Sequence, residues 1–164
     1  LGNRNIGYVG SCRNEDRYIG YMDTLKKNNL DMIPEYVVET DQTEREGYEA
    51  MEQLLKTDDC PTGIYCANDI TAVGMLKYLR RCRNLYFTPS IIASDNIEEA
   101  QFTKPMLTTV ALPREEMGRF AIYLLLDRMK GGHTGVVRME LSGKLLIRNS
   151  CSHVSESFWS DYCI

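Results

Sequence analysis

Three polar side chains stand where predicted strands end. Arg17 follows the apolar run that closes at Gly10, Asn68 follows the run 63–67, and Asp95 follows the run 90–93. An arginine and a carboxylate can each engage two adjacent hydroxyl groups, and an amide both donates and accepts hydrogen bonds. If the three side chains converge, they form a binding set for a sugar or another small polyol-like ligand.

Each of these residues also has a purely structural interpretation. The pair Asn68–Asp69 is favoured at helix N-caps, and on spacing alone capping is the commoner role. The pair Asp95–Asn96 could equally cap a short turn that follows it. Arg17 could pair with an acid of the preceding segment, Glu15–Asp16, or with nothing. Their shared location at strand ends is what favours a ligand site.

The elements that must position these residues alternate along the first 95 residues. Short β-branched apolar runs predict strands, and stretches of helical period predict helices between them. Because parallel neighbours need a crossover that is usually a helix, the order predicts an α/β fold with a parallel, doubly wound, Rossmann-like sheet and flanking helices. Strands are expected at 6–9, 36–38, 63–67 and 90–93, and helices at 15–29, from caps at 40–43 to about 56, and from 68–69 through Leu79.

The pattern changes after Asp95. Residues 105–110 are predicted to be extended, and Pro113 to open a helix over 114–130 that Gly131–Gly132 ends. Residues 136–141 and 144–147 are predicted as two strands joined by a turn at 142–143. We therefore expect one folded lobe over residues 1–152, with its long helix at about 113–131, and an irregular tail over 153–164.

Composition excludes several classes of function. The 164 residues are 43% hydrophobic and 26% charged, with a formal net charge of −4, which is typical of a globular protein and opposes DNA binding by this segment itself. The six cysteines form no C-x-x-C pair, and with two histidines no zinc spacing arises, so we expect reduced thiols, a cytoplasmic location and no metal. No P-loop, G-x-S-x-G or G-x-G-x-x-G motif is present, so neither a cofactor nor an enzyme activity is expected.

Six segments, in order along nearly the whole chain, resemble the motifs of one family. The family is the LacI/GalR transcription regulators, whose effector-binding core shares the fold of type I periplasmic sugar-binding proteins. The segments are Leu-Gly-Asn-Arg-Asn-Ile-Gly-Tyr-Val-Gly at 1–10, Arg-Tyr-Ile-Gly-Tyr at 17–21, Ile-Tyr-Cys-Ala-Asn-Asp-Ile-Thr-Ala-Val-Gly at 64–74, Ile-Ile-Ala-Ser-Asp-Asn-Ile-Glu at 91–98, Pro-Met-Leu-Thr-Thr-Val at 105–110 with Glu-Met-Gly at 116–118, and Leu-Leu-Ile-Arg-Asn-Ser at 145–150.

The resemblance implies a role for the same three residues. It puts effector contacts, with a sugar or sugar derivative as the expected ligand, on Arg17, Asn68 and Asp95. The sequence departs from the family pattern at Ala93–Ser94, where a glycine and an aromatic residue are usual, and at Leu112, where a glutamine is common. Both departures lie near the expected crevice, so the identity of the ligand cannot be copied from a sugar-specific relative.

The resemblance also implies what surrounds this segment. The chain opens on Leu1 and carries no helix-turn-helix, so we expect the C-terminal half of an effector-binding core, with operator DNA bound only by an absent N-terminal domain. The helix 114–130 crosses to the other lobe in the family, and its apolar stripe (Met117, Phe120, Ala121, Leu124 and Leu125) then lacks a partner.

A homodimer is expected through Val73, Leu76, Ile97 and Phe102. The alternatives are a secreted solute-binding protein of a transporter and a small α/β enzyme.

Overall fold

The computed structural model describes residues 1–57, 59–82 and 88–153. Its strands are β1 (Ile6–Gly10), β2 (Val37–Glu39), β3 (Gly63–Cys66), β4 (Ser90–Ser94), β5 (Thr108–Ala111) and β6 (Lys144–Leu146). Its α-helices are α1 (Asp16–Lys27), α2 (Glu44–Leu54), α3 (Asp69–Arg81) and α4 (Arg114–Met129), with 3-10 turns η1 (Pro34–Tyr36) and η2 (Glu98–Gln101).

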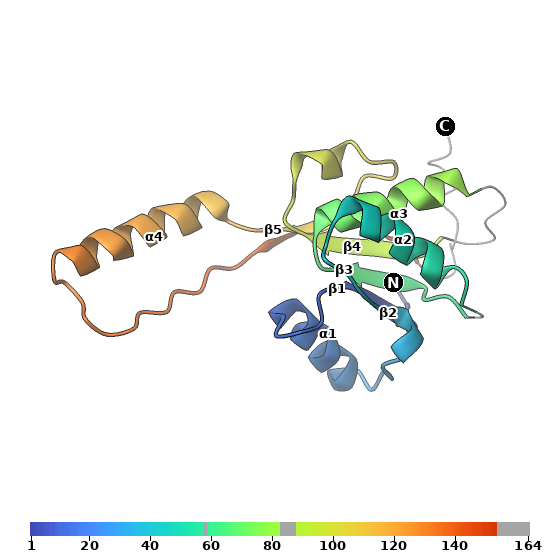
Figure 1. The fold of residues 1–164 in the computed structure, drawn as a ribbon, viewed down its shortest axis with the longest axis horizontal. Helices are drawn as coiled ribbons and strands as arrows, with labels where there is room; N and C mark the ends of the chain where they lie inside the picture. Colours follow the sequence, from blue (N-terminus) through green and yellow to red (C-terminus); the bar gives the residue numbers. More distant parts are fainter. Residues whose placement is uncertain (58, 83–87, 154–164) are drawn as a thin grey trace.

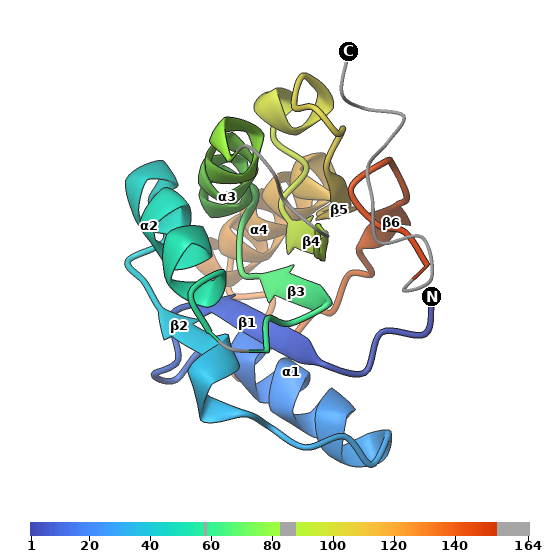
Figure 2. The same ribbon diagram turned by 90° about the vertical axis from the view of Figure 1, so that its right-hand side faces the viewer.

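One sheet in the order β2-β1-β3-β4-β5-β6 forms the centre of the body. The first five strands run parallel, and β6 pairs antiparallel with β5. Helix α1 covers one face, while α2 and α3 cover the other (Figure 2). The predicted doubly wound α/β fold is therefore confirmed, with one antiparallel edge strand added.

Close contact between α2 and α3 builds the larger core. A Cβ atom on Gly47 of α2 would collide with the Thr71 carbonyl of α3, and one on Gly74 of α3 would collide with the Glu44 carbonyl of α2. The two glycines thus let the helix backbones approach each other. Beneath the helices lie the buried side chains of both layers, among them Val9, Met51, Ile64, Met75 and Ile91.

An aromatic cluster fills the space under α1. Tyr8 of β1 is fully buried, and its ring centroid lies 5.2 Å from Tyr18, 5.3 Å from Tyr21 and 5.8 Å from Tyr65. Leu25 and Ala67 complete this second core. Because both cores close on the same sheet, the sheet is the rigid frame whose carboxyl edge carries the polar residues singled out above.

Helix starts follow the predicted caps. Thr43 and Glu46 form a capping box at the start of α2, and the Asn68 side chain caps α3 by accepting from the Thr71 amide at 3.0 Å. Glu15 caps α1 in the same way, accepting from the Arg17 amide. These local bonds satisfy amides that have no partner inside the helix, which is why the boundaries agree with the sequence to within a few residues.

One predicted strand is shifted by a residue, and another is wrong. Tyr36 lies in η1, so only Val37 and Val38 of the segment 36–38 belong to β2. Residues 136–141 form no strand, and β6 pairs instead with β5, with Leu146 opposite Thr109. The physical reason is that a strand needs a neighbour to satisfy its backbone, and 136–141 run through a part of the described structure that lies away from the sheet.

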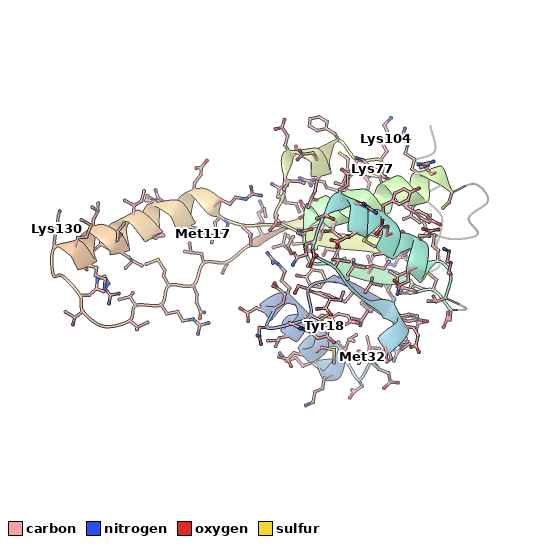
Figure 3. The ribbon with its side chains drawn as sticks, in the orientation of Figure 1. Tyr18, Met32, Lys77, Lys104, Met117 and Lys130 are labelled. Atoms are coloured by element: carbon pink, nitrogen blue, oxygen red, sulfur yellow. The ribbon has the colours of Figure 1, made fainter. Side chains whose placement is uncertain are left out.

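That part is a long arm. Helix α4 and the segment that returns from it extend away from the body, with Met117 near the inner end of the helix and Lys130 at its far end (Figures 1 and 3). No residue of α4 is buried. Its apolar side chains surround most of the helix and do not form the single stripe that the sequence predicted; the most exposed are Ile122, Tyr123, Leu125 and Met129.

The described residues hold no helix with both the length and the apolar character needed to span a bilayer.

Candidate functional site

Arg17, Asn68 and Asp95 lie at one edge of the sheet. They follow β1, β3 and β4, which are adjacent and parallel, so their carboxyl ends face the same way. In open α/β sheets this edge is where ligands bind. The structure thus confirms the shared location of the three residues, although it joins only two of them directly.

The direct contact is between Arg17 and Asp95. Arg17 Nη2 lies 3.5 Å from Asp95 Oδ1, and Arg17 Nη1 lies 3.3 Å from Glu15 Oε1. The two paired side chains remain 33% and 28% exposed, so a ligand can reach both. Desolvation raises the pKa of Asp95, while the positive charges of Arg17 and Arg114 lower it. A guanidinium and a carboxylate 78 positions apart in the chain therefore meet at an open edge.

Asp95 and Asn96 form a turn with an unusual backbone. Their φ angles are +120° and +51°, a region that non-glycine residues seldom adopt. The Asp95 amide donates to the Val110 carbonyl at 2.9 Å, and the Asn96 amide donates to Thr109 Oγ1 at 3.3 Å. The following turn η2 begins after Ile97 and has no side-chain cap. The capping interpretation of Asp95–Asn96 is therefore wrong, and their side chains serve other contacts.

Asn68 has a structural role. Its Oδ1 caps α3, and its Nδ2 donates to the Gln42 carbonyl at 3.2 Å. One N–H and one lone pair of the amide are not used by these two bonds. Among the contacts of the described residues, none joins Asn68 to Arg17 or Asp95, so a ligand contact at Asn68 stays a prediction.

The adjacent Asp69 holds the site together from beneath. It is fully buried, and it accepts from Thr109 Oγ1 at 2.6 Å and from the Ile97 amide at 2.9 Å. Burial raises the pKa of this carboxyl group, and the two hydrogen bonds oppose that shift. Sequence reasoning treated Asp69 only as a cap. The structure shows that it fixes the segment after Asp95 to β5.

Tyr65 and Ser94 are site residues that the sequence did not single out as a pair. The Tyr65 hydroxyl lies 3.3 Å from Ser94 Oγ, across the two central strands. Ser94 stands where the family commonly has an aromatic residue, and the aromatic ring near this edge is supplied by Tyr65 of β3 instead. Only the register of β3 on β4 brings the two together, so no signal in the sequence could have paired them.

A hollow of about 580 Å³ lies along α1 and shares Arg17 and Tyr65 with this edge of the sheet. It extends from Arg17 past Gly20 to Leu30 and is floored by Ile6 and Ile92 of the sheet. Ile6 opens β1 and Leu30 lies beyond the end of α1, so the hollow follows the face of the sheet and only its rim reaches the carboxyl edge. Its lining is mostly apolar, unlike the Arg17–Asp95 pair.

The residues predicted for dimer contacts lie on the opposite side of the sheet from α1. Val73 and Leu76 are almost buried, whereas Phe102 is 76% exposed. These three line a hollow of about 260 Å³, with Lys77 and Lys104 among the cations around it (Figure 3). Ile97 packs against the core under α3 and is only partly accessible. Lys77 is paired with Glu44 at 2.7 Å.

Other reactive side chains lie away from this edge or outside the described residues. His133 pairs with Asp127 at 2.6 Å on the arm. Cysteines 12, 60, 66, 82 and 151 are free thiols, while Cys163 belongs to the tail that the structure does not describe. Over the described ranges, no group of three or more histidine, cysteine or acidic side chains could hold a metal ion. The tail predicted for 153–164 also lies outside the described residues, apart from His153.

A doubly wound sheet with polar side chains at its carboxyl edge has the architecture of small-molecule-binding α/β modules. Comparison with known proteins agrees. Residues 1–151 match the family described as periplasmic binding protein-like domain. The chain belongs to this family, in the form that makes up the effector-binding core of LacI/GalR regulators.

Three relatives illustrate the match. The transcriptional repressor CytR of Escherichia coli K12 is 40% identical over 136 residues, which cover 82% of this chain and 40% of CytR. The transcriptional regulator CelR in complex with cellobiose has a TM-score of 0.83 at 28% identity, over 92% of this chain and 47% of that one. A LacI-family regulator of Enterococcus faecium with bound ribose has a TM-score of 0.75 at 26% identity, over 90% and 56%. The chain thus spans less than half the length of its curated relatives.

Proposed function

We propose that this chain is the effector-sensing part of a LacI-type transcription regulator and that its effector is a small hydroxylated molecule, a sugar or sugar derivative. The observation that carries the proposal is the partly exposed Arg17–Asp95 pair at the carboxyl edge of the sheet. The names of similar proteins support it, since they describe transcriptional repressors and complexes with cellobiose and ribose. The role is one of binding, with no chemical step.

The pair can recognise adjacent hydroxyl groups. The Asp95 carboxylate accepts two hydrogen bonds and the Arg17 guanidinium donates two, so a vicinal diol can replace the long 3.5 Å contact between them with shorter bonds. Asn68 adds its remaining N–H and lone pair. Contacts from this side alone would leave the ligand half exposed to water. We therefore assign residues 1–152 to one lobe of a two-lobed site, with α4 crossing to the other lobe.

Effector binding would act by shifting a conformational equilibrium. A ligand that contacts both lobes favours the lobe arrangement in which both sets of contacts are made, and the population of that arrangement rises with its differential affinity. DNA contact belongs to a segment beyond this acidic chain. A transporter's solute-binding protein has the same fold, but the relatives named above favour the repressor function.

We also infer that the regulator is a homodimer, through the surface around Val73, Leu76 and Phe102. The support is the high exposure of Phe102 beside a hollow whose floor is apolar. Ile97 is predicted for the same interface, but it packs against the core, so less of its side chain is available to a partner subunit. Two-fold pairing is the commonest closed arrangement of soluble proteins.

The test of the site uses the full-length protein that contains this chain. Binding of D-ribose and of cellobiose is measured by calorimetry for the wild type, for Asp95→Asn and for the control Asp23→Asn, which alters an exposed carboxylate on α1. We expect Asp95→Asn to weaken binding by roughly 10-fold or more, as for a lost charge-assisted hydrogen bond, and to leave the thermal midpoint nearly unchanged. A collapse of stability with unchanged affinity would show that the carboxylate is structural.

A further inference from the structure

The turn at Asp95–Asn96 is held by Arg114, at the start of the arm, and by Arg148, which lies on the body beyond β6. Arg114, the first residue of α4, donates from Nη2 to the Asp95 carbonyl oxygen. Arg148, just beyond β6, donates from Nη2 to Asn96 Oδ1 at 2.6 Å and from Nη1 to the Leu107 carbonyl at 2.8 Å. Strand β5 leads toward the arm and β6 returns from it (Figure 1). Arg114 therefore holds the turn from the outgoing connection, and Arg148 holds it from the body, beyond the end of β6.

Arg148 is itself fixed on the sheet. Its backbone amide donates to Thr108 Oγ1 at 3.0 Å, and Ser150, two residues on, accepts from the Thr108 amide at 2.8 Å and donates to the Ile91 carbonyl at 2.6 Å. The guanidinium therefore reaches from the β5–β6 pair to the turn, and both of its terminal nitrogens donate hydrogen bonds. A planar fork anchored in this way can set the direction of the Asn96 amide.

The turn needs such support. Two successive non-glycine residues with positive φ keep that conformation only where surrounding contacts hold it. Strand β5 supplies bonds to the amides of Asp95 and Asn96, from Val110 and Thr109, and Asp69 of α3 supplies the bond to the Ile97 amide. Those bonds fix the backbone nitrogens, whereas Arg114 and Arg148 act on the carbonyl of Asp95 and the side chain of Asn96.

We propose that Arg148 is a positioning residue, which acts through Asn96 to keep the Asp95 carboxylate directed at the ligand, and that Arg114 couples the ligand-binding turn to the path of the arm. This inference rests on the proposed function for the role of Asp95. A displacement of Arg114, as when the arm changes its angle to the body, then shifts the Asp95 carbonyl relative to Arg148, which stays on the sheet. Conversely, a ligand that fixes the turn restrains the arm, because coupling of two sites is reciprocal.

The first experiment needs no ligand. Amide hydrogen exchange is measured by NMR in the full-length protein for Arg148→Met, for Arg148→Lys and for the control Arg45→Met, which removes an exposed arginine of α2. In Arg148→Met we expect exchange at Asn96 and Ile97 to rise about 10-fold or more while exchange in Ile6–Gly10 changes less than about 2-fold. Arg148→Lys keeps the positive charge but lacks the two terminal guanidinium nitrogens, so exchange should rise by an intermediate amount. Arg45→Met should not raise exchange. No change at the turn, or an equal change in β1, would overturn the positioning role.

The second experiment separates this inference from the proposed function. D-ribose is titrated into the wild type, Arg148→Met, Asp95→Asn and the double variant. We expect Arg148→Met to weaken ribose binding about 10-fold alone and less than about 2-fold in the Asp95→Asn background, because a residue that acts through Asp95 has no effect without it. Equal losses in both backgrounds would contradict the positioning role. Binding of ribose that is insensitive to Asp95→Asn, or no binding by the wild type, would instead contradict the proposed function, and the exchange result would still decide the role of Arg148.

Discussion

At the scale of single residues, the buried carboxylate of Asp69 contributes more to stability than its place at the start of a helix indicates. Its two acceptor bonds join α3 to β5 and to the segment after Asp95. Replacing it with alanine leaves the Thr109 hydroxyl and the Ile97 amide without their partner. We expect Asp69→Ala to lower the free energy of unfolding by about 2–4 kcal/mol, whereas the exposed Asp23→Ala should change it by less than about 0.5 kcal/mol. Urea unfolding measures both, and an Asp69→Ala midpoint equal to that of wild type would refute this role.

The Cys66 thiol predicts how stability depends on alkaline pH. Burial raises its pKa from the ordinary value of 9.0 to about 12. Between these values the folded chain keeps a proton that the unfolded chain loses, so the free energy of unfolding falls as pH rises above 9. The slope for one such group is about 1.4 kcal/mol per pH unit.

The matched variant is Cys66→Ala. Burial also raises the pKa values of Cys60 and Tyr21 to about 12. The free energy of unfolding of the variant should therefore still fall with pH, but with a slope smaller by the contribution of one titrating group. Chemical denaturation at pH 8, 9 and 10 gives both slopes. Identical slopes for wild type and variant would mean that the folded Cys66 thiol ionises as readily as the unfolded one.

At the scale of elements, the contact between α2 and α3 depends on glycine. A Cβ atom on Gly74 would collide with the backbone of Glu44, which cannot move without displacing α2. We expect Gly74→Ala to destabilise the fold by about 1–3 kcal/mol, as for overpacking. Gly20 of α1 is the matched control, since a Cβ there would meet no atom within 4 Å, and Gly20→Ala should stabilise by up to about 1 kcal/mol. Thermal unfolding of the two variants should therefore shift in opposite directions.

At the scale of the whole molecule, the arm leaves a large apolar surface in water. Ile122 and Leu125 are each about three-fifths exposed, and apolar residues surround most of α4. Because a helix of this composition is normally covered, we expect the isolated 164-residue chain to self-associate, as a two-fold dimer, at micromolar concentration. Light scattering measures the mass.

Two variants separate the arm from the body as the cause of that association. The double variant Ile122→Lys, Leu125→Lys should shift the chain toward monomer, because charged side chains disfavour burial of the helix surface. Phe102→Lys tests the surface proposed for the native dimer and should change the mass less if the arm dominates. A wild-type chain that is already monomeric would refute the prediction and imply that α4 folds back onto the body.

Features that depend on near neighbours along the chain could be predicted from the amino-acid sequence alone. Capping side chains and apolar periodicity placed α2 and α3 to within a few residues, since the Thr43–Glu46 box and the Asn68 cap act over three residues. The alternation of strands and helices then determined the parallel sheet and put Arg17, Asn68 and Asp95 at one edge. Comparison with known motifs identified the family from the same local segments.

Only the tertiary structure decided which distant groups meet. The Arg17–Asp95 pair spans 78 positions, the Thr109–Asp69 bond 40, and the Arg148–Asn96 bond 52. No local pattern encodes such partners, because they depend on strand order, on register and on the path of the chain between them. The same reason explains the failure at 136–141, where β-type residues make no strand: a strand is stabilised by its neighbour, and only the three-dimensional path shows whether one is there.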